Sequence, residues 1–75
     1  MKVKDLPKKL IAVRLKLGLT QTQMAKRIGL SVSPAHVAEF ESGFTEPDLS
    51  IILAYSEIAG VHMEVFANDN LELPE

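Results

Sequence analysis

Side chains that usually carry catalysis or hold metals are sparse in this sequence. The 75 residues include no cysteine and only two histidines, His36 and His62. A zinc site needs three or four ligands, and neither histidine has a second histidine or a cysteine close to it in the sequence. The four glycines are spread along the chain, so they form no glycine-rich loop that cradles a phosphate. We therefore expect no metal, no cofactor and no enzymatic activity.

The charged side chains are distributed very unevenly along the chain. All eight lysines and arginines lie within residues 1–27 together with one acid, Asp5, which gives this part a net charge of +7. Residues 28–75 contain nine acids and no lysine or arginine, a net charge of −9. Such a split is typical of a protein with a polyanion-binding face, but the two halves can equally attract one another within the fold or between subunits. The sequence leaves both interpretations open.

Apolar residues recur at helical spacing along most of the chain, which predicts a single all-α domain with one small core. The first helix is expected to have Asp5 as its N-cap and lysines, including Lys9, on its outer faces. Its predicted core positions are Leu6, Leu10, Val13 and Leu17. In the fourth helix, one face carries Leu49, Ile52, Leu53 and Ser56, and Ile51, Tyr55 and Ile58 lie beside it. Because this helix is the most apolar, it is expected at the centre of the fold. The predicted helices span residues 6–17, 21–28, 34–42, 49–59 and 63–67, followed by an extended tail over residues 68–75.

Two of these helices, 21–28 and 34–42, are joined by a short turn. Thr20 precedes the first and Ser33–Pro34 opens the second, and these residue types favour N-caps and first helical positions. Gly29 suits the left-handed position at which a helix ends. A helix, a tight turn and a second helix form the arrangement that places a recognition helix in the major groove of DNA.

Three stretches, in this order, resemble the phage-repressor and Cro type of helix-turn-helix domain, the Xre family. They are RLKLGLTQTQMAKRIG, EFESG and EPDLSIILAYSEIAGV, and the likeness covers residues 8–67. The resemblance implies a five-helix, lambda-repressor-like fold. It also implies a sequence-specific DNA-binding regulator of transcription that reads a palindromic double-stranded operator as a homodimer.

The same resemblance assigns roles to individual residues. Gln21 matches a residue that contacts phosphate at the start of a helix. Arg14 and Glu41 match a partly buried ion pair that ties the first helix to the third. On the recognition helix, His36 can donate to guanine and Glu39 can accept from the amino group of cytosine, although either can equally be a solvated surface residue. The candidates for DNA contact are Gln21, Ser31, Ser33, Ala35, His36, Glu39 and Lys16.

Two features depart from the family pattern. The link that follows Gly29 is about two residues longer than the usual turn, so the recognition helix is expected to start late or to tilt. The DNA-facing side also lacks lysine and arginine, because the helix carries His36 and Glu39 and the next loop carries Phe44 and Glu46. A carboxylate beside a phosphate repels it, which weakens DNA affinity. The alternative function is therefore a helix-turn-helix-fold protein-interaction module, such as an antitoxin or a dimerising adaptor.

The C-terminal apolar residues Met63, Val65 and Phe66 have two interpretations. They can close the core as a last helix, or they can contact a second subunit, because palindromic operators are read by two-fold dimers. Leu71 and Leu73 in the tail would extend such an interface. No segment reaches the ~18 apolar residues of a membrane span, and MKVKDLPKKL does not resemble a signal peptide. We therefore expect a cytoplasmic protein with no membrane partner.

Overall fold

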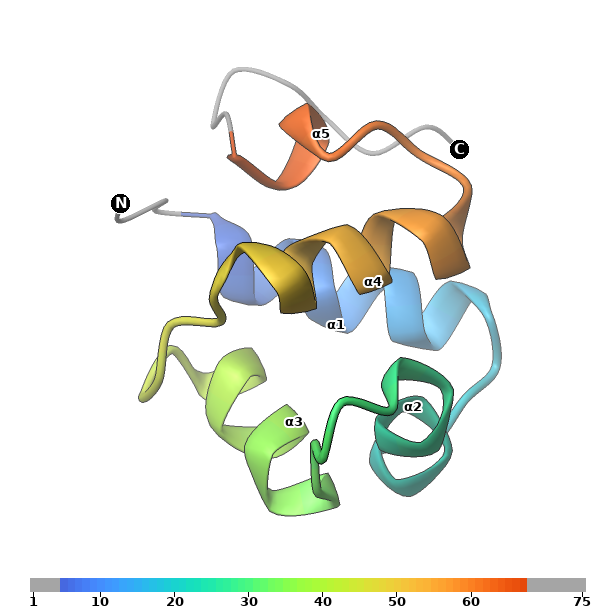
Figure 1. Ribbon diagram of the computed structural model, residues 1–75, viewed down its shortest axis with the longest axis vertical. Coiled ribbons are helices and arrows are strands. Elements are labelled where there is room, and N and C mark those ends of the chain that lie inside the picture. The colour runs from blue at the N-terminus through green and yellow to red at the C-terminus, as the bar shows by residue number, and fades with distance from the viewer. Residues whose placement is uncertain (1–4, 68–75) are drawn as a thin grey trace.

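The computed structural model describes residues 5–67, and these form five helices without a strand (Figure 1). Helix α1 contacts α3, α4 and α5, while α2 contacts α3 and α4. In Figure 1, α2 and α3 lie on one side of the layer that contains α1 and α4, and α5 lies on the other side. The predicted tail over residues 68–75 falls outside the described residues. The helices are α1 (Leu6–Lys16), α2 (Gln21–Ile28), α3 (Pro34–Ser42), α4 (Leu49–Ala59) and α5 (Glu64–Ala67).

Local capping explains where α2 and α4 begin. The Thr20 hydroxyl accepts from the backbone N–H of Gln23, and the Gln23 side chain accepts in return from the N–H of Thr20. This reciprocal capping box satisfies two donors that helix geometry leaves without partners. Asp48 caps α4 by accepting from the N–H of Ile51 at 3.1 Å. The predicted cap at Asp5 is wrong, because its φ of −96° and ψ of 6° are not the extended conformation of an N-cap, and its side chain makes no capping bond.

Two predictions for α1 are wrong. Leu17 was expected in the core, but α1 ends at Lys16 and Leu17 is 40% exposed at the C-cap. Lys9 was expected on an outer face, but it is buried, and its ammonium donates to the carbonyl of Val65 at 2.6 Å. Burial of the lysine is compatible with its charge because the carbonyl supplies a hydrogen-bond partner. This bond ties α1 to α5.

The core face of α4 takes residues from both of the neighbouring groups named in the sequence. Leu49 and Leu53 are 64% and 47% exposed, whereas Ile51 and Tyr55 are buried. Ile52 and Ser56 are buried as well, so the core face keeps half of the first group and adds residues from the face beside it. Apolar side chains surround most of α4, so periodicity alone cannot select one of two adjacent faces, and packing against α1 and α2 makes the selection.

Helix α5 closes the core. It begins at Glu64, one residue later than predicted, and Phe66 is fully buried. The ring of Phe66 meets that of Tyr55 edge to face, with the centroids 6.2 Å apart. Met63 and Val65 are half-buried. Phe66 therefore has the core-closing role that was one of its two interpretations, while the tail leucines lie outside the described residues.

The turn between α2 and α3 absorbs the extra chain length. Leu30 and Ser31 have φ values of 54° and 62°, and the N–H of Val32 donates to the carbonyl of Gly29 at 2.9 Å. Two consecutive left-handed residues closed by this hydrogen bond form the pattern of a type I′ turn. Such φ values are costly for residues with a Cβ. Since the added residues are folded into this turn, α3 still begins at Pro34, as predicted.

The left-handed conformation of Leu30 and Ser31 leads to a prediction about stability. Replacing Leu30→Asn together with Ser31→Gly supplies the residues that type I′ turns favour and should raise the free energy of unfolding by about 1 kcal/mol. Urea unfolding followed by circular dichroism measures the change. Leu30→Ala with Ser31→Ala is the control, because both Cβ atoms remain. An equal gain from the alanine pair would show that loss of an exposed leucine, and not relief of backbone strain, is responsible.

Candidate nucleic-acid interface

The N-terminus of α3 is held by a second reciprocal cap. The Ser33 hydroxyl accepts from the N–H of His36 at 3.2 Å, and the Nδ1 atom of His36 accepts from the N–H of Ser33 at 3.1 Å. A neutral imidazole that accepts at Nδ1 carries its proton on Nε2. The His36 ring also stacks on Phe40, with the centroids 6.5 Å apart. The cap therefore orients an exposed side chain whose Nε2–H remains available as a donor.

The exposed part of α3 is its first turn. Pro34, Ala35 and His36 are exposed, whereas Val37 and Phe40 are buried against the other helices. Two predicted contact residues, Ala35 and His36, thus lie together on the solvent side of α3. The Ser33 hydroxyl, a third, is occupied by the cap, and Ser31 is exposed in the preceding turn.

Gln21 lies at the first position of α2 and connects this helix to α3. Its side-chain amide donates to Glu41 Oε1 at 3.1 Å, so part of its hydrogen-bonding capacity is used within the fold. The backbone N–H groups of the first helical residues, Gln21 and Thr22, have no acceptor inside an α-helix. The positive end of the helix dipole also favours an anion there. The N-terminus of α2 can therefore still bind a phosphate.

The predicted partners Arg14 and Glu41 form a two-pronged ion pair between α1 and α3. Arg14 Nε donates to Glu41 Oε2 at 2.7 Å, and Nη2 donates to Oε1 at 3.1 Å. Arg14 Nη1 also donates to the carbonyl of Leu19 at 3.0 Å. Hydrogen bonding to Glu41 raises the pKa of Arg14 above its usual value. Because Glu41 is buried and paired, its charge does not contribute to an acidic outer face.

Tyr55 packs in the core near this ion pair. Its hydroxyl is buried and has no hydrogen-bond partner within the described part of the chain. Burial raises the pKa of Tyr55, and the negative charge of Glu41 raises it further. The phenol is therefore neutral, and its hydroxyl group contributes an uncompensated desolvation cost.

Two other predicted contact residues are Glu39 on α3 and Lys16 on α1. Glu39 is half-buried, and its Oε1 accepts from the Thr45 hydroxyl at 3.2 Å, which ties it to the loop that follows α3. Lys16 is exposed in the last turn of α1. The roles of Thr45 and of His36 as a cap were not predicted. The capping box of Thr20 and Gln23 has a readable signature, because Thr-x-x-Gln is its sequence pattern.

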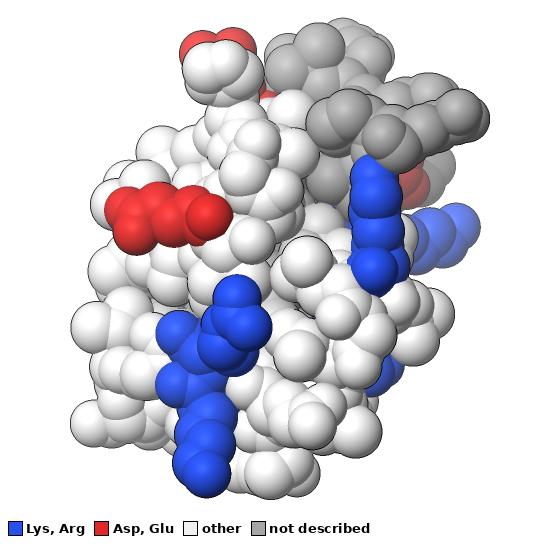
Figure 2. Space-filling view, turned by 90° about the vertical axis from the view of Figure 1, so that its right-hand side faces the viewer, with Lys and Arg blue, Asp and Glu red and all other residues white. Residues whose placement is uncertain are grey.

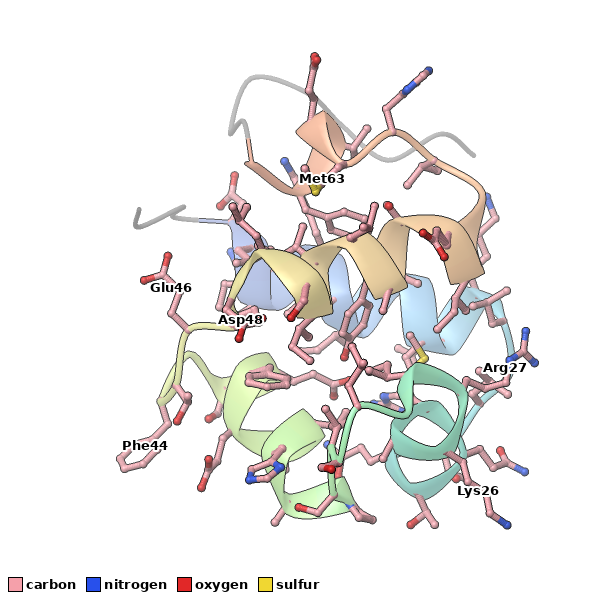
Figure 3. The ribbon with its side chains drawn as sticks, in the orientation of Figure 1. Lys26, Arg27, Phe44, Glu46, Asp48 and Met63 are labelled. Atoms are coloured by element: carbon pink, nitrogen blue, oxygen red, sulfur yellow. The ribbon has the colours of Figure 1, made fainter. Side chains whose placement is uncertain are left out.

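The basic side chains do not form one continuous patch on the face shown in Figure 2. They occur in separate groups, one at the height of α2 and another at the height of α1, with an acidic side chain above the lower group. Lys26 and Arg27 are exposed and project from α2 on the opposite side of the molecule from Glu46 and Asp48 (Figure 3). Lys26 and Arg27 thus border α2, whereas Glu46 and Asp48 border the loop after α3.

Residues 5–67 carry neither a metal cluster nor a membrane-spanning helix. No group of three or more histidine, aspartate or glutamate side chains in this range is placed to hold a metal ion. None of the described helices is long and apolar enough to cross a membrane.

The Arg14–Glu41 pair makes a second stability prediction. Arg14→Ala leaves the buried Glu41 carboxylate without its charged partner and should lower the free energy of unfolding by about 1–3 kcal/mol. Denaturant unfolding measures the loss. Arg27→Ala is the control, because it removes an exposed arginine and should change stability by less than about 0.5 kcal/mol. Equal losses in the two variants would contradict the structural role of the pair.

The unsatisfied hydroxyl of Tyr55 makes a third prediction. Tyr55→Phe removes this group but keeps the ring that packs against Phe66, so stability should be unchanged or should rise by up to about 1 kcal/mol. Calorimetric unfolding measures the effect, and Tyr55→Leu, which also loses the ring, is expected to destabilise. A marked loss of stability in Tyr55→Phe would mean that the hydroxyl has a stabilising partner.

Comparison with models of protein families matches residues 10–66 to the family described as Helix-turn-helix. The matched range includes α2, the turn and the whole of α3. Comparisons with curated proteins and with solved structures returned no match. The family match and the all-helical fold together show that this chain belongs to the helix-turn-helix family of DNA-binding domains, in its Cro and phage-repressor (Xre-like) form.

Proposed function

We propose that the protein is a sequence-specific regulator of transcription that reads a palindromic operator as a homodimer, with α3 in the major groove. The observation that carries the proposal is the exposed first turn of α3, which is held by its own cap. In this fold the two helix N-termini approach DNA together, one at the bases and one at the backbone.

In this proposal, the side chains of the first turn of α3 contact the bases. The Nε2–H of His36 is a donor that suits the N7 or O6 acceptors of guanine. Ala35 has a small apolar side chain that lets the helix approach closely and suits the methyl group of thymine. Ser31 lies where a hydroxyl can bond a phosphate. These are few contacts, so we expect modest sequence discrimination from each subunit.

In this proposal, the start of α2 and nearby cations bind the phosphates. Gln21 supplies a backbone N–H and part of its amide, and the candidate cations are Lys16, Lys26 and Arg27. Pairing with Arg14 neutralises Glu41, which leaves Glu39 as the unneutralised carboxylate on α3. The interface is therefore less acidic than the sequence of α3 indicates, although phosphate contacts remain few and binding should depend strongly on salt.

Dimerisation through α5 and residues 68–75 is part of the proposal. Phe66 is committed to the core, so the half-buried apolar residues that remain for a partner here are Val65 of α5 and Met63, which directly precedes the helix. A two-fold dimer would place two copies of α3 one helical turn of DNA apart.

The second candidate function is a protein-interaction module on the same fold, such as an antitoxin or a dimerising adaptor. The acids of the loop after α3 favour it, because Glu46 and Asp48 are exposed there. Carboxylates at this position repel a phosphate backbone and attract a basic protein.

Selection of bound sequences from a random duplex library tests the proposed function. An enriched palindrome and a gel shift that weakens steeply with salt are expected. Absence of any enriched sequence, together with no binding even at ~50 mM salt, would refute DNA binding and leave the protein-interaction function.

Two substitutions at His36 separate DNA reading from capping. His36→Gln keeps a capping-box residue at this position but replaces the imidazole, so DNA affinity should fall about tenfold while the melting temperature is unchanged. His36→Ala should lower both, because it also removes the cap. Titration of the selected duplex and thermal unfolding measure the two quantities. Unchanged affinity in both variants would show that His36 does not contact DNA.

A further inference from the structure

The loop after α3 and the first turns of α4 expose large apolar side chains. Phe44 is 82% exposed, Leu49 is 64% exposed and Leu53 is 47% exposed. Leu49 and Leu53 are four residues apart on α4, so they share one helix face. Exposed apolar side chains that share a face, as the two leucines do, mark interaction sites more often than isolated ones do. We call Phe44, Glu46, Asp48, Leu49 and Leu53 the loop surface.

Hydrogen bonds hold this surface in one conformation. The N–H of Phe44 donates to the carbonyl of Glu39 at 3.0 Å, and the Thr45 hydroxyl donates to the Glu39 carboxylate. At the other end of the loop, Asp48 caps α4 and also accepts from the Ser50 hydroxyl at 2.6 Å. Because the surface is already ordered, a partner would lose little affinity to the ordering of this loop.

The charge of the loop surface is negative. Glu46 and Asp48 are exposed among its apolar side chains, and residues 28–67 contain no lysine or arginine. The hydrogen bonds from the Ser50 hydroxyl and the Ile51 N–H lower the pKa of Asp48, which keeps it ionised at neutral pH. Figure 3 shows Phe44, Glu46 and Asp48 on one side of the molecule, with Phe44 pointing away from the two acids, and Lys26 and Arg27 on the opposite side.

The exposed apolar side chains and the negative charge together limit which kind of molecule the loop surface can bind. DNA is disfavoured because its phosphates would meet the carboxylates of Glu46 and Asp48, whereas Lys26 and Arg27 lie on the opposite side of the molecule. A second copy in a two-fold contact is disfavoured because isologous packing brings the same patch of both subunits together, and hence like charges. A protein segment that carries both cations and apolar side chains can pair with the carboxylates of the loop surface and also cover its apolar side chains. Its arginines can also stack on the ring of Phe44.

We propose that the loop surface is a docking site for a basic amphipathic segment of another protein. Phe44 and the two leucines supply the apolar anchors, and Glu46 and Asp48 pair with the cations that flank the apolar side chains of the partner. Aromatic anchors carry much of the binding energy at such sites, and rim charges set partner choice. The site is separate from the proposed DNA-reading turn of α3, so its test does not depend on whether the protein binds DNA.

The test uses two synthetic helical peptides of about four turns with identical leucine positions, one with lysine and arginine at the polar positions and the other with glutamate. Backbone amide shifts in nuclear magnetic resonance spectra locate binding on the full-length protein. The basic peptide should bind with shifts centred on residues 44–53, and the acidic peptide should not bind. Phe44→Ser and Leu49→Ser should each weaken binding at least about fivefold.

Two matched controls isolate the surface from general apolar and acidic attraction. Leu15→Ser removes a leucine on α1 that is 62% exposed, close to the 64% of Leu49, and should not change binding. Glu64→Gln removes an exposed acid of α5 and should weaken binding of the basic peptide less than Glu46→Gln does. Equal effects of Leu15→Ser and Leu49→Ser, shifts located elsewhere, or no binding would overturn the proposal. The same shifts produced by duplex DNA, or by self-association of the free protein, would overturn it as well.

Discussion

The position of the recognition helix depends on one buried ion pair. Glu41 comes from α3, and its carboxylate is held by Arg14 of α1 through two hydrogen bonds and by Gln21 of α2 through a third. Removing a carboxylate from water is costly unless such partners are present. The pair thus joins three helices at one point, and a shift of any of them would leave a buried charge without a full set of partners.

Residues that orient the helices are also the ones nearest the proposed DNA surface. His36 caps α3 with one ring nitrogen and offers the other to solvent, and Gln21 opens α2 while its amide bonds to Glu41. Capping bonds fix these side chains before a ligand arrives, which reduces the entropy lost on binding. The consequence is that contact with DNA and stability share residues, so substitutions at these positions must separate the two effects.

Some of the basic and acidic side chains that are separated along the sequence also lie on opposite sides of the folded molecule. Lys26 and Arg27 border α2, whereas Glu46 and Asp48 border the loop after α3 on the opposite edge of the molecule (Figure 3). Of the two interpretations of this charge split, internal attraction accounts for the pairing of Arg14 with Glu41. The exposed charges that remain favour a basic side for nucleic acid and an acidic side for protein.

The sequence by itself determined the helix-turn-helix unit and the bounds of α2, α3 and α4, because Thr20, Ser33 and Asp48 cap their helices through bonds that reach only three residues. On α1 the spacing also identified Leu6, Leu10 and Val13, which are buried, whereas only the tertiary structure decided which face of α4 is buried. The exposure of Leu49 and the burial of Lys9 follow from how the helices cross and from which carbonyl lies opposite each side chain. These long-range contacts leave no trace in local periodicity, since an apolar helix fits several faces equally until its neighbours are in place.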